Sequence, residues 1–155
     1  MSHILIVCTA NICRSPVGEA VLRDRLQKQG LPDWTVASAG TWALDGHSAS
    51  PHSVTVMAEK GLDLREHLAQ TVTGQMLAEA DLVLCMELGH VEALQAEFPR
   101  HRDKIFLFSE MVGKRYSVAD PYGGPLDGYQ RMAQEVTNLV DNGLERIITL
   151  ARANQ

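Results

Sequence analysis

The chain has 155 residues, of which 45% are hydrophobic, so it can bury one well-formed core and we expect a single domain spanning residues 1–155. The formal net charge of −5 argues against nucleic acid or an acidic membrane surface as a partner, because such binding needs clustered lysine and arginine. No apolar run approaches the roughly 18 residues of a membrane-spanning helix, which argues against membrane insertion. The chain enters its first predicted strand without a basic leader, so a cytoplasmic location is expected.

The first predicted elements are a short buried strand, a tight loop and a helix. Residues 4–7 are apolar and rich in β-branching, which is typical of a strand in the middle of a parallel sheet. Pro16 favours a helix start, because its fixed φ suits the first helical position, and Ser15 before it is a good N-cap. Apolar residues then recur at helical spacing to about Gln29, and Gly30 is a credible C-cap.

The loop between this strand and helix carries a cysteine and an arginine in a setting suited to an anion. In a strand, loop and helix geometry the backbone N–H groups of Thr9 to Arg14 can point inward, and the positive end of the helix dipole adds to their attraction for a dianion. Cys8 lies at the floor of this cradle, where nearby positive charge favours the nucleophilic thiolate. Arg14 supplies a planar fork of donors that suits two phosphoryl oxygens. The segment therefore predicts nucleophilic attack on phosphorus.

The rest of the chain alternates predicted strands and helices, which indicates an α/β fold. A strand at 34–38 after the first helix completes a right-handed βαβ unit of a parallel sheet. The further predicted elements are helix 51–60, strand 80–86, helix 87–98, strand 104–108 and helix 126–151. We therefore expect a four-stranded parallel sheet with helices on both faces and a site at the carboxyl ends of the strands.

The cysteines and histidines indicate neither a disulfide framework nor a metal. The three cysteines, Cys8, Cys13 and Cys85, are too few and too scattered for a secreted-type framework or a zinc site. The six histidines show no HExxH pattern, so we expect no metal and no cofactor. Cys85 is most simply a core residue. Cys13 is either a small buried filler or a partner for Cys8 in a reversible disulfide.

The segment Val-Cys-Thr-Ala-Asn-Ile-Cys-Arg-Ser-Pro at residues 7–16 resembles the signature of the low-molecular-weight protein tyrosine phosphatases. The resemblance spans nearly the whole chain and implies a three-layer fold with strand order 2-1-3-4 and a phosphate-binding loop after the first strand. It implies hydrolysis of protein phosphotyrosine through a phosphocysteine on Cys8, with Arg14 binding the phosphoryl group. Members of this family are known for a disulfide switch in this loop. Ala10 stands where the family mostly has glycine, so the loop would be strained if that position needs a positive φ.

A late Asp-Pro-Tyr sequence resembles the acid motif of the family and makes Asp120 the candidate general acid and base. It would protonate the leaving oxygen and then take a proton from the water that hydrolyses the phosphocysteine. Tyr122 and Trp42 are the expected walls of the cleft, although a place in a small hydrophobic cluster suits Trp42 almost equally well. Ser15 would act as N-cap or as donor to the sulfur of Cys8.

The resemblance also assigns supporting residues and partners. Ser38, in a Ser-Ala-Gly sequence, would support Asn11 by hydrogen bonding, and His67 would reach the back of the loop; otherwise each is an ordinary structural residue. The residues expected to bind substrate are Thr9, Ala10, Asn11, Ile12, Cys13, Ser15, Trp42 and Tyr122. The expected partners are a tyrosine-phosphorylated protein and, as product or inhibitor, inorganic phosphate or a similar oxyanion. We expect a monomer.

Four alternative functions fit the sequence less well. Phosphoarginine-specific members of the family carry threonine where this loop has Ile12, whose larger side chain leaves less room for a branched guanidinium. A thiol-dependent arsenate reductase on this fold needs two further cysteines, and after Cys85 residues 86–94 contain none. A non-enzymatic phospho-ligand module or phosphocysteine carrier needs neither Arg14 nor Asp120. A flavodoxin-like nucleotide binder would have no nucleophile in its first loop.

Overall fold

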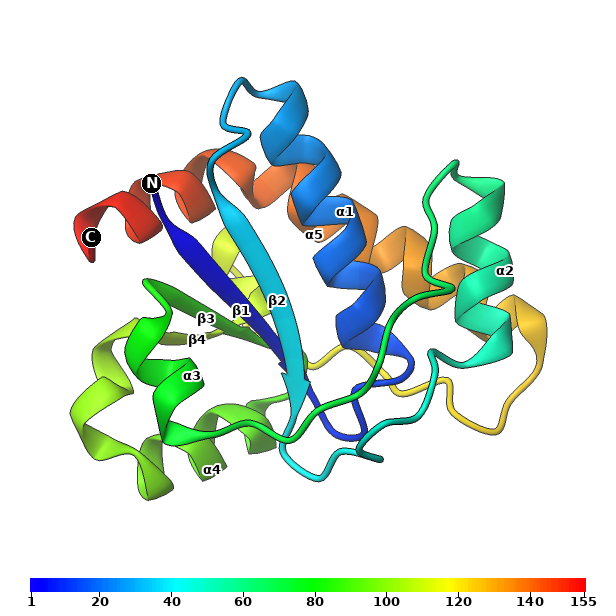
Figure 1. The fold of residues 1–155 in the computed structure, drawn as a ribbon, viewed down its shortest axis with the longest axis horizontal. Helices are drawn as coiled ribbons and strands as arrows, with labels where there is room; N and C mark the ends of the chain where they lie inside the picture. The colour runs from blue at the N-terminus through cyan, green and yellow to red at the C-terminus, as the bar shows by residue number, and fades with distance from the viewer.

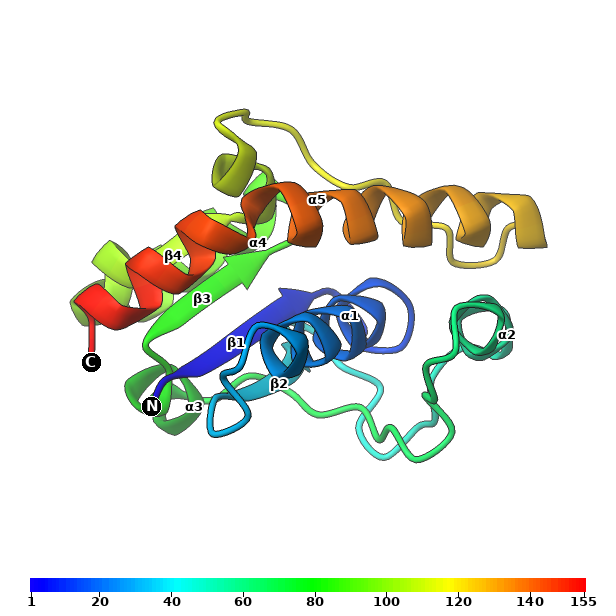
Figure 2. The same ribbon diagram turned by 90° about the horizontal axis from the view of Figure 1, so that it is seen from above.

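A computed structural model describes all 155 residues of the chain, in which a four-stranded parallel sheet lies between two layers of helices (Figures 1 and 2). The strands are β1 (His3–Cys8), β2 (Thr35–Gly40), β3 (Leu82–Cys85) and β4 (Ile105–Leu107), in the order β2-β1-β3-β4. The α-helices are α1 (Arg14–Lys28), α2 (Pro51–Glu59), α3 (Gly74–Glu79), α4 (Leu88–Glu97) and α5 (Leu126–Ala153), with 3₁₀ helices at Pro99–Lys104 and Phe108–Val112. The predicted sheet and its strand order are confirmed.

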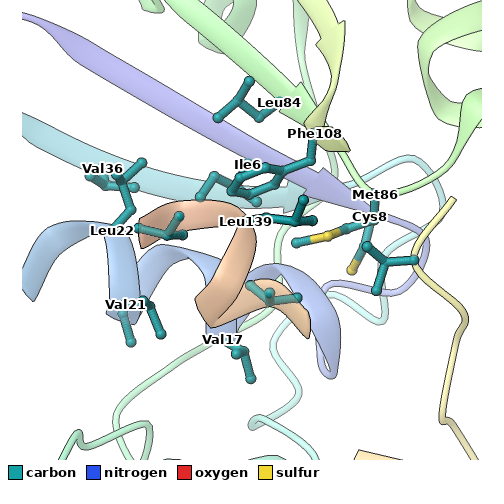
Figure 3. Close-up of a cluster of buried hydrophobic side chains, with 14 of the residues drawn as sticks. Ile6, Cys8, Val17, Val21, Leu22, Val36, Leu84, Met86, Phe108 and Leu139 are labelled. Carbon is teal, nitrogen blue, oxygen red and sulfur yellow. The ribbon is translucent and has the colours of Figure 1, made fainter. Parts of the chain in front are cut away.

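The central strand β1 contributes side chains to two separate cores, one on each face of the sheet. Ile4, Ile6 and Cys8 belong to the larger core, which includes residues of α1, α2 and α5, whereas Leu5 and Val7 belong to the smaller core beneath α3 and α4. Figure 3 shows side chains of the larger core between the sheet and helices α1 and α5. Because both faces of β1 are covered, its apolar run has no polar alternation. Cys8, the last residue of this strand, is therefore buried and lies at the carboxyl end of the sheet, where the loop begins.

Helix α1 begins at Arg14, so the prediction that Ser15 is its N-cap and Pro16 its first residue is wrong. Cys13 occupies the N-cap position and makes no side-chain capping hydrogen bond. Pro16 falls within the first turn, where backbone N–H groups have no intrahelical partner, so the helix tolerates it there as well. The Ser15 hydroxyl is turned toward Cys8 instead of capping the helix. Arg14 thus projects from the first helical position.

Helix α3 and strand β2 are among the other elements that differ from the prediction. Helix α3 was not predicted, because a helix of this length is too short to show a clear periodicity of hydrophobic residues. Thr73 caps its N-terminus and accepts a 3.2 Å hydrogen bond from the N–H of Met76. Strand β2 continues past the predicted end to Gly40, where a β-carbon would overlap the carbonyl oxygen of Thr9. The glycine therefore permits the close approach of β2 to the loop.

None of the helices is both long and apolar enough to cross a membrane.

Candidate active site

The loop between β1 and α1 is held from outside through its carbonyl groups. Every carbonyl from Cys8 to Cys13 accepts a hydrogen bond from the surrounding chain. The donors are the backbone N–H groups of Thr41, Trp42, Leu44 and Ser50, the Nε2 of His67 and the Oγ of Ser53, at 2.6 to 3.2 Å. The predicted reach of His67 to the back of the loop is thus observed, since its Nε2 lies 2.6 Å from the carbonyl oxygen of Asn11.

This arrangement turns the N–H groups of the loop inward. The carbonyl and N–H groups of a planar trans peptide point in opposite directions, and none of the N–H groups of residues 9–13 donates a hydrogen bond to another group of the protein. Next to them lies a cavity of about 280 Å³. Its lining residues are Cys8, Thr9, Ala10, Ile12, Cys13, Arg14, Trp42, Leu44, Asp120 and Tyr122. Unpaired N–H groups around a small cavity form a site for an oxyanion.

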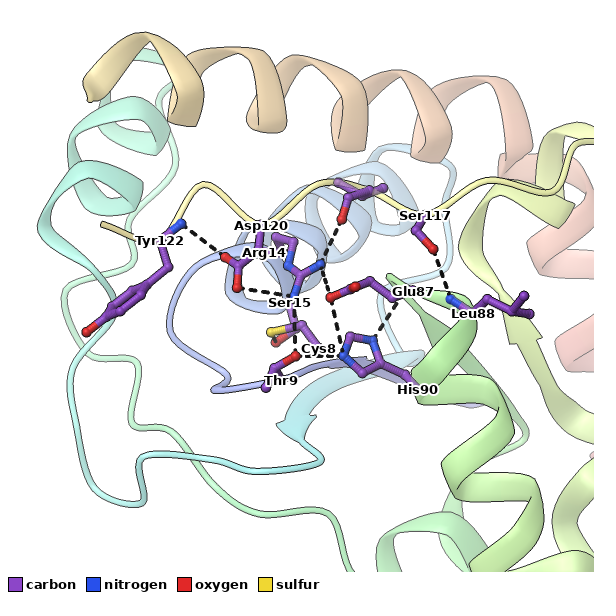
Figure 4. A network of polar contacts seen from close by, with 11 residues as sticks. Cys8, Thr9, Arg14, Ser15, Glu87, Leu88, His90, Ser117, Asp120 and Tyr122 are labelled. Carbon is purple, nitrogen blue, oxygen red and sulfur yellow. Dashed lines mark hydrogen bonds and ion pairs between the residues drawn. The ribbon is translucent and has the colours of Figure 1, made fainter. Parts of the chain in front are cut away.

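Arg14 is held at one edge of its guanidinium and free at the other (Figure 4). Its side chain is 1% exposed, and Nη1 lies 2.7 Å from the carbonyl oxygen of Val118 and 2.7 Å from Oε2 of Glu87. Nη2 has only longer contacts, at 3.4 Å to Oγ1 of Thr9 and 3.6 Å to Oδ2 of Asp120, and Nε has no partner. The edge formed by Nε and Nη2 is therefore available to two oxygens of a ligand.

A chain of hydrogen bonds leads from a carboxylate to the sulfur of Cys8. The Ser38 hydroxyl donates to Oε1 of Glu19 at 2.6 Å, and Nδ2 of Asn11 donates to Ser38 at 3.0 Å and to Ser15 at 2.8 Å. The Ser15 Oγ in turn lies 2.9 Å from the Sγ of Cys8. Because Ser15 accepts from Asn11, its own proton is left for the sulfur, where it would stabilise a thiolate. The expected contact between Ser38 and Asn11 is present.

The left-handed backbone position of the loop is Asn11, not Ala10. Asn11 is the only non-glycine residue with a positive φ, at 61°, so Ala10 does not need a positive φ and the strain considered for it does not arise. Asparagine tolerates this region better than most residues. Its Oδ1 also accepts a 3.0 Å hydrogen bond from the N–H of Gln70, so the side chain is fully engaged in holding the loop.

Two residues that were not predicted to lie at the site, Glu87 and His90 after β3, reach it. Glu87 pairs with Arg14, and His90 places its Nε2 2.8 Å from Oγ1 of Thr9. His90 is 6% exposed, and burial, followed by the charge of Arg14, lowers the pKa of His90 to about 4. The sequence feature that could have revealed Glu87 is its place directly after the strand that pairs with β1. No sequence feature could have placed His90 at the site.

The outer part of the cavity is apolar and exposed. The side chains of Trp42 and Tyr122 line it, and they are 82% and 64% exposed. The Asp120 carboxylate, with its side chain 44% exposed, accepts a 3.1 Å hydrogen bond from the N–H of Tyr122 and lies beside Arg14. Trp42 thus stands at the cavity, outside either buried core. The predicted nucleophile, phosphate ligand, acid and aromatic walls are all brought to one cavity.

The other two cysteines occupy different environments. The Sγ of Cys13 lies 3.5 Å from Oη of Tyr129, and burial raises the pKa of the Cys13 thiol. Cys85 is fully buried in the smaller core, on the face of the sheet opposite to the one that holds Cys8. A relay of electrons from Cys8 to Cys85 would have to cross the sheet, which argues against an arsenate reductase.

Comparisons with known proteins find related sequences and structures over nearly the whole chain. The model of the family described as low molecular weight phosphotyrosine protein phosphatase matches residues 3–152. A probable low molecular weight protein-tyrosine-phosphatase, EpsP, from Ralstonia nicotianae is 39% identical over 147 residues, which are 95% of this chain and 97% of the relative. A protein-arginine-phosphatase from Bacillus subtilis is 38% identical over 138 residues, which are 88% of this chain and 91% of the relative. The solved structure of a cysteine-to-serine mutant of the YwlE arginine phosphatase, with phosphorylated active site serine, matches with a TM-score of 0.90 at 34% identity and covers 99% of each chain.

Proposed function

Because the chain belongs to the low-molecular-weight phosphotyrosine protein phosphatase family, we propose that it hydrolyses phosphotyrosine in proteins through a phosphocysteine on Cys8. The observation that carries this proposal is the set of unpaired N–H groups of residues 9–13 beside a cavity that Cys8 lines, together with the free Nε of Arg14. These donors match the equatorial oxygens of a phosphoryl group and strengthen their hold as charge builds up in the transition state.

In the first step, the Cys8 thiolate attacks phosphorus and the bond from phosphorus to the tyrosine oxygen breaks. A phenolate is a poor leaving group unless it receives a proton, and general acid catalysis is worth about 10²- to 10⁴-fold. Asp120 lines the same cavity as Cys8 and is held by the N–H of Tyr122, which suits it to deliver this proton. The products of this step are tyrosine and phosphocysteine.

In the second step, water attacks the phosphocysteine and the sulfur leaves as thiolate. Asp120, now a carboxylate, takes the proton from this water. The Ser15 hydroxyl, 2.9 Å from the Cys8 sulfur, donates to the departing thiolate and lowers the barrier to its release. Inorganic phosphate is then the product. Every proton and electron pair is accounted for by these residues and water.

The aromatic ring of the substrate would lie between Trp42 and Tyr122. Stacking of two aromatic rings contributes about 0.5 to 1.5 kcal/mol beyond buried area. The exposure of both side chains leaves the cleft open to a ring presented on a protein surface. A tyrosine-phosphorylated protein is therefore the substrate we propose, with inorganic phosphate and similar oxyanions as competing ligands of the loop.

A second candidate substrate is phosphoarginine, because the Bacillus subtilis relative is a protein-arginine-phosphatase. Ile12 lines the cavity and is 7% exposed, so its apolar side chain narrows the space beside the phosphoryl group. A planar phenol fits this space better than a branched guanidinium. Phosphotyrosine therefore remains the preferred substrate.

The test compares turnover of an aryl phosphate and of matched peptides carrying phosphotyrosine, phosphoserine or phosphoarginine. Assays are run in the presence of a chelator. We expect the phosphotyrosine peptide to be hydrolysed fastest, and Cys8→Ser to remove turnover. Activity that survives Cys8→Ser would refute the mechanism, and a faster rate on phosphoarginine would reverse the order of the two substrates. Phosphate binding without any turnover would favour a non-enzymatic module.

A further inference from the structure

The hydroxyl of Thr9 lies within hydrogen-bonding reach of two donors, His90 and Arg14 (Figure 4). Nε2 of His90 lies 2.8 Å from Oγ1 of Thr9, and Nη2 of Arg14 lies 3.4 Å from the same oxygen. Thr9 is also one of the residues that line the cavity beside Cys8. The direction of the Thr9 hydroxyl proton therefore decides whether this side chain can donate a hydrogen bond to a ligand in the cavity.

The backbone fixes which nitrogen of His90 carries the proton. The N–H of Glu87 donates a 3.1 Å hydrogen bond to Nδ1 of His90, so that nitrogen is an acceptor. With its pKa lowered to about 4 by burial and by Arg14, the ring is neutral near pH 7 and has its single proton on Nε2. His90 therefore donates to Thr9, and Thr9 accepts.

The Thr9 oxygen thus accepts from His90 and, more weakly, from Arg14. No hydrogen bond of the protein offers an acceptor for the hydroxyl proton itself. Since both lone pairs of the oxygen face these two donors, the hydroxyl proton is left to point away from them. An oxygen atom of a ligand in the cavity is the acceptor that remains.

We propose that the Thr9 side chain donates a hydrogen bond to a bound phosphoryl oxygen, and that His90 is the positioning residue that directs this proton into the cavity. The identity of the ligand rests on the phosphatase function proposed above. A histidine in its neutral form acts here only as a donor, which is what the arrangement needs. A carboxylate in the same place would accept the Thr9 proton and withdraw it from the ligand.

The test measures the affinity of the whole protein for inorganic phosphate by calorimetry, and kcat and KM for an aryl phosphate. Thr9→Val removes the hydroxyl at nearly the same shape, and we expect about tenfold weaker phosphate binding, as for the loss of a hydrogen bond to a charged group. Thr9→Ser keeps the hydroxyl and should retain most of the affinity. His90→Phe should weaken binding several-fold, and the double variant should bind no more weakly than Thr9→Val alone.

The controls separate this role from a general effect on folding. His101→Phe, on the 3₁₀ helix Pro99–Lys104, is a matched change away from the cavity and should bind phosphate like the wild type. Wild-type phosphate affinity in Thr9→Val would overturn the proposal. So would a His90→Phe substitution that lowers phosphate affinity by the same factor in the wild type and in Thr9→Val. Phosphate binding needs no turnover, so a wild-type protein inactive on aryl phosphate would count against the phosphatase function, while the binding data would still decide the part played by Thr9.

Discussion

The Glu87 carboxylate lies 2.7 Å from Nη1 of Arg14, on the side of the guanidinium that faces away from the free Nε. Glu87 is the N-cap residue of α4, and β3 before it is the parallel neighbour of β1. The carboxyl ends of these two strands meet at one edge of the sheet, which brings the carboxylate to the arginine. Together with the Val118 carbonyl, it fixes the rotation of the guanidinium before any ligand arrives.

Replacing Glu87 should therefore damage phosphoryl binding without removing any group that touches the ligand. For Glu87→Ala we expect kcat/KM to fall about 10- to 100-fold, because a buried arginine that loses its anchor is no longer held in one orientation. Glu92→Ala, on the exposed face of the same helix, should leave kcat/KM unchanged. Steady-state kinetics with an aryl phosphate measure kcat/KM of both variants. A Glu87→Ala enzyme as active as the Glu92→Ala enzyme would show that Val118 alone holds Arg14.

Asp120→Asn should separate chemistry from binding. The substitution keeps the size of the side chain and removes its acid, so we expect kcat on an aryl phosphate to fall by about 10² to 10⁴. Asp120 lies 3.6 Å from Nη2 of Arg14, where its negative charge opposes that of a bound dianion. Inorganic phosphate should therefore bind as tightly as to the wild type, or more tightly. A parallel loss of kcat and of phosphate affinity would assign Asp120 to binding instead of proton transfer.

The features set by local sequence were predicted well. The apolar run of β1 and the loop between Cys8 and Arg14 were predicted at their observed places, because strand and loop depend on neighbours in the chain. The error at Ser15 is also local, but it concerns a single residue. A helix can begin two residues before a proline, and only the backbone of the folded loop shows that its left-handed residue is Asn11.

The residues that were missed act across the fold. Glu87 and His90 reach the loop only because β3 pairs with β1 and α4 starts at the same edge of the sheet. The strand order could have indicated the contact of Glu87, since a residue directly after β3 must lie near the end of β1, but it was not used in this way. The contact of His90 with Thr9 depends on the rotation of α4 about its own axis. This rotation is determined by the packing of α4 against the smaller core.

Asn11 offers a direct measure of strain in the loop. Asn11→Ala and Asn11→Gly lose the same three side-chain hydrogen bonds, to Ser15, Ser38 and the N–H of Gln70. They differ only in the β-carbon, which is unfavourable at a φ of 61°. We expect the free energy of unfolding, measured in urea, to be about 1 kcal/mol lower for Asn11→Ala than for Asn11→Gly. Equal stabilities would show that the loop relaxes out of the left-handed conformation once the asparagine is gone.

The three cysteines should react with iodoacetamide in a fixed order. Cys8 lines the cavity beside unpaired N–H groups and should be alkylated first, with protection by inorganic phosphate. Burial raises the pKa of the Cys13 thiol, so it should react more slowly, and the fully buried Cys85, whose pKa burial also raises, should react only after unfolding. Peptide mass spectrometry at neutral pH gives the order. Faster labelling of Cys13, or of Cys8 in the presence of saturating phosphate, would contradict it.

His90 should give the protein a distinct loss of stability in mild acid. The unfolded chain binds a proton at this histidine below about pH 6.5, whereas the folded protein resists protonation until its pKa of about 4. Lowering the pH through this window therefore favours unfolding, by a total on the order of 3 kcal/mol that levels off below the folded pKa. His90→Phe removes this contribution, so its free energy of unfolding should fall less steeply between pH 6.5 and pH 4 than that of the wild type. Urea titrations across this range measure both slopes, and parallel curves for the two proteins would mean that His90 is protonated as readily in the fold as in the unfolded chain.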